Sequence, residues 1–149
     1  MKTLNPHDVQ ITSLDDVLVR ELLKEVKRRG FTMHYFGRNP REPELMAAVY
    51  RWPNGHADVV ILRGKTDATA FRSDCAPNDD PFKPRIIHYL YNDTATWAMR
   101  AILTIGAPGT PTAPHDKQKA PKSCFIPDEI MKHDHTIVPP MQRVGGVRG

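Results

Sequence analysis

Histidines and a cysteine in the last third of the chain are the side chains whose types suit a metal ion. His133 and His135 are separated by one residue, and Cys124 and His115 lie upstream of them. Structural zinc sites favour spacings such as C-x2-C or H-x3-H, which place two ligands together on one side of the ion. Neither spacing occurs in this sequence. We therefore expect no metal site and no cofactor, and an exposed polar segment in that region.

His88 is the best candidate for a general base. Its side chain changes charge near neutral pH, and it lies in a β-branched and aromatic segment, residues 85–91. The sequence shows no second group that pairs with it. A G-x-S-x-G nucleophile elbow and the glycine-rich phosphate-binding loops are also absent from the sequence. A small enzyme that uses His88 therefore ranks third among the functions that we consider.

Three arginines near predicted strand ends and a tryptophan beside a predicted turn are candidates for binding a partner. An aromatic side chain beside arginines is a typical anchor for a protein. The net charge of +4 comes from 21 basic and 17 acidic residues spread along the chain, whereas nucleic-acid binders usually show a clustered basic surface. Nucleic-acid association is therefore the alternative to protein binding. Together with two apolar residues of the last third, the candidate binding residues are Trp52, Arg51, Arg63, Arg72, Phe125 and Ile126.

Apolar periodicity before residue 106 predicts the elements that position these side chains. A stripe with helical spacing predicts a helix from Ser13, its N-cap, to Gly30. A second stripe after Asp93 and Thr94 predicts a helix that ends at Gly106. Residues 57–63 are apolar on both faces, which predicts a central strand. The predicted strands are residues 31–36, 45–52, 57–63, 68–72 and 85–91.

These elements predict an α+β fold of two layers. We expect a mostly antiparallel sheet of three to five strands, in the order α-β-β-β-(β)-α, with both helices on one face. The expected core is Leu18, Leu22, Val26, Val49, Val60, Leu62, Trp97, Ala101 and Ile102.

The element order resembles that of double-stranded-RNA-binding domains over residues 13–106. Those domains need a lysine cluster at the start of the second helix to contact phosphates. Here the helix begins with the sequence DTATW from Asp93, and Arg100 is its only basic residue. The resemblance covers topology alone and therefore implies no RNA-binding site.

The chain changes character after Gly106. Seven of the 14 prolines lie between residues 108 and 140, and such a segment lacks the apolar surface that would offset its ordering entropy. We predict a compact domain, residues 1–106, followed by a proline-rich extended tail, residues 107–149. Apolar residues such as Phe125 and Ile126 can dock on a partner or on the protein's own sheet. Our first hypothesis is a non-enzymatic protein-binding or accessory module that uses an open sheet face and this tail.

Composition limits the remaining classes. Two cysteines, Cys75 and Cys124, are too few for a disulfide scaffold, and whether they are free, bridged or metal-bound stays open. The first residues lack the apolar core of a secretory signal, and no apolar run approaches the ~20 residues that span a bilayer. We therefore expect a cytoplasmic protein that does not enter the membrane, with a homo-oligomer possible.

Overall fold

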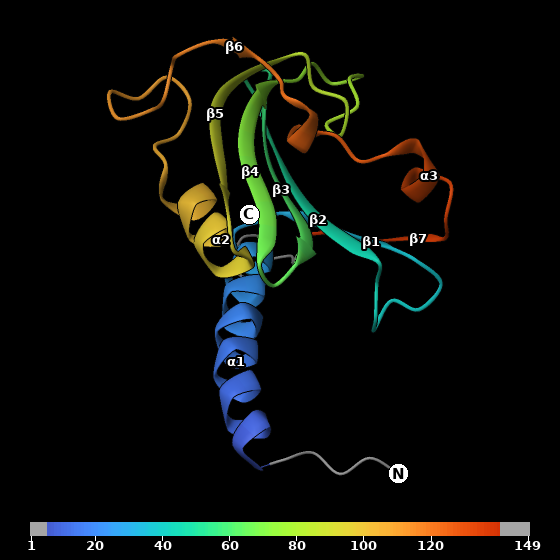
Figure 1. Cartoon of the computed structure of the whole chain (residues 1–149). Helices are drawn as coiled ribbons and strands as arrows, with labels where there is room; N and C mark the ends of the chain where they lie inside the picture. The colour runs from blue at the N-terminus through green and yellow to red at the C-terminus, as the bar shows by residue number, and fades with distance from the viewer. Residues whose placement is uncertain (1–5, 141–149) are drawn as a thin grey trace, which may run out of the picture.

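An antiparallel sheet of seven strands forms the centre of the molecule in residues 6–140, the part of the chain that the computed structural model describes. Its strands lie in the order β6-β5-β4-β3-β2-β1-β7, and every neighbouring pair is antiparallel (Figure 1). The fold is α+β, as the sequence predicts. The strands are β1 (Thr32–Phe36), β2 (Leu45–Trp52), β3 (His56–Gly64), β4 (Asp67–Asp74), β5 (Ile86–Asp93), β6 (Gln118–Lys119) and β7 (His135–Val138).

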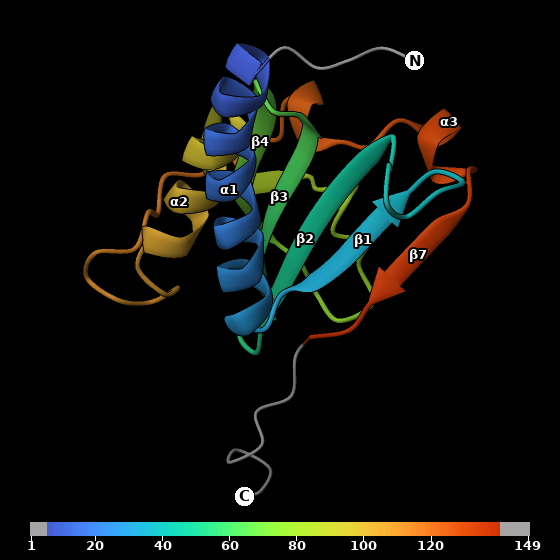
Figure 2. The same ribbon diagram turned by 90° about the horizontal axis from the view of Figure 1, so that it is seen from below.

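Two helices cover one face of this sheet, here called the helix face (Figure 2). They are α1 (Pro6–Arg28) and α2 (Ala95–Thr104). The predicted N-cap of α2 is confirmed, because Thr94 Oγ1 accepts a hydrogen bond from the Trp97 amide at 3.4 Å. The predicted N-cap of the first helix is wrong. Ser13 lies inside α1, which begins at Pro6, a residue type that suits the first helical turn.

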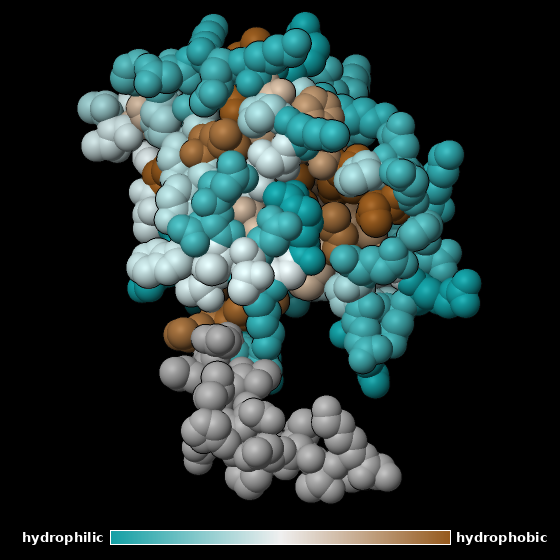
Figure 3. All heavy atoms as spheres, in the orientation of Figure 1, coloured by the Kyte–Doolittle hydropathy of each residue, from teal (hydrophilic) through white to brown (hydrophobic). Residues whose placement is uncertain are grey.

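The residues after α2 cover the opposite face, here called the tail face. A 3-10 turn, η1 (Lys122–Cys124), and a short helix, α3 (Asp128–Met131), lie along this segment. Cys124 is fully buried and Ile126 is 2% exposed, both packed in one cluster with Phe71 and Ile87. Figure 3 shows further apolar side chains in a hollow on this side of the molecule. The expected open sheet face is therefore covered by the protein's own chain.

Two of the seven strands come from the segment that we expected to be irregular. β6 pairs with β5 at one edge of the sheet, and β7 pairs with β1 at the other edge. The prediction of three to five strands is thus too low. Both additions are short, and their pairing depends on edges formed by distant parts of the chain, so local periodicity carries no signal for them. Whether residues 1–106 fold without residues 107–149 stays a prediction.

The expected core is confirmed in the sheet and is partly wrong in the helices. Val26, Val49, Val60, Leu62 and Ile102 are buried, whereas Leu18 is 45% and Trp97 is 53% exposed, and Leu22 and Ala101 are half-buried. The error in α2 has a geometric cause. Its buried stripe is rotated from the predicted one and consists of Ala95, Ala98, Met99 and Ile102.

Within residues 6–140, no helix has both the length and the hydropathy needed to cross a membrane.

Both cysteines are free and buried. Burial raises the pKa of the Cys124 thiol to about 11, so this thiol is not a reactive nucleophile at neutral pH.

Candidate functional site

Two histidines and an aspartate from three neighbouring strands meet at one end of the sheet. His56 begins β3, Asp74 ends β4, and His88 lies near the start of β5. Their candidate ligand atoms all lie within 4.8 Å of one another, and this is the one such group among the described residues. We call this cluster the His–Asp–His site.

Strand register and a β-bulge bring the three side chains together. His56 and Asp74 are direct partners across β3 and β4. In the next pair, Ser73 is opposite Ile87 and Arg72 is opposite Tyr89, so His88 is an extra residue between the two partners. A bulge of this kind turns the side chain of the extra residue relative to the regular pleat, and bulges are frequent beside active sites. Here it directs His88 towards Asp74.

The carboxylate of Asp74 faces both imidazoles, whose rings also pack edge to face with centroids 5.2 Å apart. His88 Nε2 is 2.6 Å and His56 Nε2 is 3.7 Å from Asp74 Oδ1. The other ring nitrogen of His56, Nδ1, lies 3.0 Å from Asn54 Oδ1, an acceptor, and therefore donates to it. In neutral His56 the lone pair is then on Nε2, the nitrogen that faces the carboxylate.

The site is buried at one side and open at the other. The side chain of His88 is 9% exposed, that of His56 is 25% exposed, and that of Asp74 is 49% exposed. Burial lowers the pKa of His56 below its usual value, and the neighbouring His88 lowers it further. His56 is therefore neutral at physiological pH, the form in which imidazole binds metal ions.

A buried ion pair lies beside this cluster on the helix face. Arg72 donates to Asp58 through Nε at 2.6 Å and through Nη2 at 2.9 Å, and their side chains are 1% and 3% exposed. Arg72 Nη1 also donates to the carbonyl oxygen of Gly106 at 2.6 Å. The guanidinium therefore fixes the chain just after α2 against the end of the sheet.

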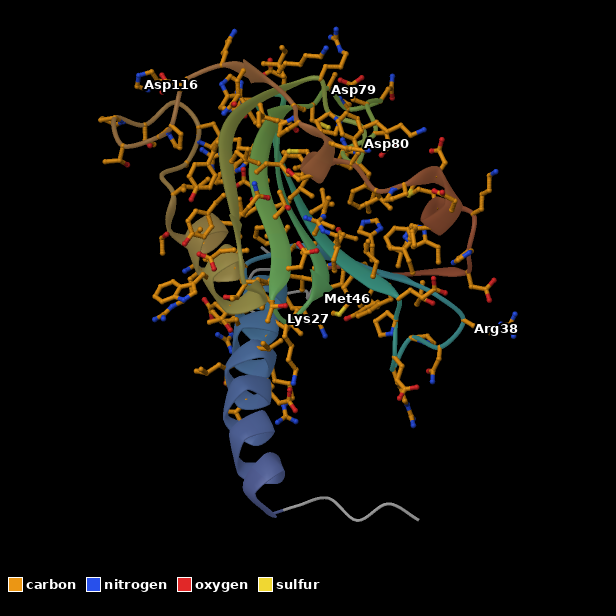
Figure 4. The ribbon with its side chains drawn as sticks, in the orientation of Figure 1. Lys27, Arg38, Met46, Asp79, Asp80 and Asp116 are labelled. Atoms are coloured by element: carbon orange, nitrogen blue, oxygen red, sulfur yellow. The ribbon has the colours of Figure 1, made fainter. Side chains whose placement is uncertain are left out.

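A pocket of about 290 Å³ adjoins the His–Asp–His site. Its walls come from the strand ends and from the loop that follows α2, residues 106–117, here called the pocket loop (Figure 1). Figure 4 places Asp116 on this loop, whereas Asp79 and Asp80 lie on the β4–β5 loop across the same end of the sheet. The lining residues are His56, Arg72, His88, Pro108, Gly109, Thr110, Ala113, Pro114, His115 and Lys117.

A second histidine cluster lies on the tail face. His34 Nδ1 of β1 is 2.9 Å from His135 Nε2 of β7, and both line a pocket of about 510 Å³ with Tyr50, Phe82 and Met131. Burial, and then the neighbouring His135, lowers the pKa of His34 to about 4. The pair is neutral at pH 7, and one ring donates its proton to the other.

The arginines selected from the sequence are all bonded within the protein. Arg72 is buried as described. Arg63 donates to the Ser123 carbonyl oxygen at 3.3 Å, to the Asp67 carboxylate and to Thr69 Oγ1. Arg51 is exposed and donates to the carbonyl oxygens of Ala76 and Asp79. The three do not form one surface, and nucleic-acid association through them stays a prediction.

The apolar candidates for binding are occupied by internal packing. Trp52 is half-buried and packs against Tyr50 and Arg72. Phe125 packs on the tail-face cluster, and Ile126 is inside it. Their use in partner binding stays a prediction.

The histidines and the cysteine of the last third are not brought together. His133 lies 3.0 Å from Glu44 Oε1, His135 pairs with His34, Cys124 is in the core, and His115 lines the pocket. His88 was a candidate from the sequence, whereas its neighbours His56 and Asp74 were not. The predicted turn at residues 64–67 places His56 and Asp74 near each other across the hairpin, but their direct pairing depends on a bulge between Leu62 and Gly64 that shifts the register by one residue.

Comparisons of the chain with protein-family models, curated proteins and solved structures give no match.

Proposed function

We propose that this protein binds one divalent transition-metal ion through His56, Asp74 and His88, and that the ion acts as a Lewis acid on a small molecule held in the adjoining pocket. Two imidazole nitrogens and one carboxylate form a ligand set of known catalytic sites. Zinc enzymes use two histidines and a carboxylate with a fourth position for water, and non-haem iron(II) enzymes use the same ligand types.

The observation that carries the proposal is the convergence of three ligand atoms within 4.8 Å on a carboxylate that is half exposed. An exposed carboxylate does not need two imidazoles to satisfy its hydrogen bonds, because water can supply them. Here one histidine reaches it from a β-bulge, and the other presents the nitrogen that carries the lone pair. Asn54 holds that second histidine through its Nδ1, the type of outer contact that orients histidine ligands of metals.

The surroundings favour a catalytic type of site over a structural one. Structural zinc sites fill four positions with protein ligands, whereas catalytic sites leave positions for water and substrate. Three ligands are present here, and the pocket lies beside two of them, His56 and His88. A bound ion would thus keep open positions, and water bound to zinc loses a proton near neutral pH.

Zinc binding to the full chain tests the proposal. We expect isothermal titration calorimetry to give one ion per chain, and Asp74→Asn to weaken binding by about 100-fold, because the variant removes the one charged ligand. Asp116→Asn is the matched control, since Asp116 lies on the pocket loop outside the cluster. Equal zinc affinity in wild type and Asp74→Asn contradicts the proposal, as does the absence of binding by zinc, cobalt(II) and iron(II).

Docking of a partner protein is the second candidate function, and β7 is the feature that favours it. This edge strand is exposed along its length, with Ile137 at 55% and Val138 at 38% exposure. An edge strand with apolar side chains can accept a strand from another chain. Trp97, with the Arg100 guanidinium 5.3 Å from its ring centre, is a further exposed apolar side chain.

Substitutions on β7 test this second function better than truncation at Gly106, which would remove the buried Cys124 and Ile126. We expect Ile137→Glu combined with Val138→Glu to abolish capture of any partner that purifies with wild type. Trp97→Glu serves as the comparison on the other side of the molecule. If the β7 variant retains that partner, strand addition at β7 is wrong.

A further inference from the structure

The pocket beside the His–Asp–His site has a volume of about 290 Å³, the lower limit for small-molecule sites. It therefore suits a small ligand or one group of a larger ligand. Its lining includes both histidines of the site and Lys117 on the pocket loop. A molecule in it can therefore contact both the cluster and an ammonium group.

The charges around this pocket favour an anion. The charge of Arg72 is balanced by Asp58, which it contacts through two hydrogen bonds. Lys117 forms no ion pair within residues 16–140, whose side chains the structure describes. The positive charge of a divalent ion at the cluster would exceed the single negative charge of Asp74. The lining residues contribute no carboxylate of their own, so with an ion bound the charges around the pocket would sum to a positive value.

The loop that carries Lys117 is anchored to the end of the sheet at Gly106. Arg72 holds the Gly106 carbonyl oxygen at 2.6 Å. A Cβ atom at Gly106 would lie 2.3 Å from Thr112 Oγ1 and 2.8 Å from Thr110 Oγ1, so the close return of the loop requires glycine. Gly109 adopts φ +87°, which also favours glycine. Binding to a preformed wall avoids the cost of ordering it.

His115 adds a polar contact with a defined orientation. Its Nδ1 lies 3.2 Å from the Ala113 carbonyl oxygen, an acceptor, and therefore donates to it. In the neutral ring, Nε2 is then an acceptor that can receive a hydroxyl proton of a ligand. With an ion bound, the pocket would combine two positive centres with one acceptor, a pattern that matches a hydrogen phosphate group or a hydroxy acid.

We propose that the ligand of this pocket carries a small oxyanion, a phosphate or carboxylate group, which contacts the ion at the His–Asp–His site and the ammonium group of Lys117. This inference rests on the proposed metal function and names the class of its substrate. The shared chemistry is an oxygen anion that can bind a metal ion and a cation together.

Cobalt(II) loaded on the full chain provides the test, because its visible absorption changes when an anion enters its coordination shell. Inorganic phosphate and acetate are titrated separately. We expect at least one of the two anions to change the spectrum in a saturable way. The anion that binds more tightly identifies the ligand class as phosphate or carboxylate. Lys117→Met should weaken that anion by about tenfold and leave cobalt(II) affinity unchanged.

Lys119→Met is the matched control, because Lys119 lies on β6 outside the pocket lining and is exposed. It should bind the anion as wild type does. If cobalt(II) binds one to one and neither anion alters its spectrum, or if Lys117→Met and Lys119→Met bind anion equally, the oxyanion inference is wrong while the metal proposal stands. If cobalt(II) and zinc both fail to bind, both proposals are wrong.

Discussion

The two histidine clusters of this molecule differ in whether a carboxylate faces both imidazoles. In the His–Asp–His site the rings of His56 and His88 pack edge to face with centroids 5.2 Å apart, the half-exposed Asp74 carboxylate faces both rings, and a pocket adjoins them. In the second cluster His34 and His135 contact each other directly at 2.9 Å. In the first arrangement, the ring nitrogens and the carboxylate oxygens remain able to bind an ion. In the second arrangement, two ring nitrogens form a hydrogen bond with each other, and this contact joins β7 to β1. Similar residue types thus form a candidate binding site in one place and a contact between two strands in the other.

The largest effect should come from the ion pair that supports only the first cluster. Arg72→Met leaves Asp58 buried and unpaired, so we expect the free energy of unfolding to fall by about 3–5 kcal/mol. Arg51→Met is the control near the second cluster. Arg51 is exposed, and its removal should cost less than 1 kcal/mol, an order-of-magnitude expectation for surface arginines. Urea denaturation measures both.

A double variant separates the charge effect from loss of packing. Arg72→Met combined with Asp58→Leu removes both charges and should recover much of the lost stability, because two apolar side chains can replace a buried pair. Equal losses in Arg72→Met and Arg51→Met, or no recovery in the double variant, would contradict the assigned role of this pair.

The next largest effect should be stabilisation of the fold by zinc, which should depend on the first cluster and not on the second. Zinc at 100 times its dissociation constant stabilises a folded protein by about 2.7 kcal/mol. We expect this gain in wild type and in the double variant His34→Ala with His135→Ala. It should vanish in His56→Ala with His88→Ala. Thermal unfolding with and without zinc measures the gain within each variant, so the intrinsic cost of the substitutions cancels. The reverse pattern would place the metal at the second cluster.

The smallest effect is a pH dependence of stability that belongs to the second cluster. His34, which faces His135, Asp80 and Arg51, has a folded pKa of about 4, against 6.5 for an unperturbed histidine. The unfolded chain therefore binds a proton at pH values between 6.5 and 4, where folded His34 does not. Stability is complete above this window and is lost as the pH falls through it.

We expect a loss of about 1 kcal/mol between pH 7 and pH 4.5 from this cluster, since partial exposure screens part of the effect. The pKa of His135 is also lowered by burial and contributes in the same direction. His34→Gln cannot titrate and keeps a hydrogen-bonding side chain, so the difference between its profile and that of wild type isolates the pair. Parallel profiles would show that the pair does not couple folding to pH.

The sequence predicts those parts of the fold that local signals determine. β2 has the predicted bounds, because it is closed by Pro53, Asn54 and Gly55, and Gly55 adopts the positive φ, +87°, that such a turn needs. The apolar run of residues 57–63 is likewise a local signal, and it predicts the central strand β3. β6 and β7 could not be predicted, since their pairing partners lie far away along the chain.

The candidate site follows the same division. The β3–β4 hairpin follows from its local turn signal, but a bulge between Leu62 and Gly64 shifts its register by one residue. That shift sets the partnerships of His56 with Asp74 and of Asp58 with Arg72. His88 reaches the cluster through a bulge, and no periodic pattern predicts a bulge. The contact between His34 and His135 spans 101 residues and depends on the full fold.

Crystallography of the full chain with zinc, with anomalous diffraction recorded at the zinc edge, tests the central claim most directly. We predict one strong anomalous peak at ~2.0–2.2 Å from His56 Nε2, a ring nitrogen of His88 and a carboxylate oxygen of Asp74, the usual zinc–ligand distances. A peak between His34 and His135, or a fully occupied zinc anywhere else with none at this cluster, would contradict the account.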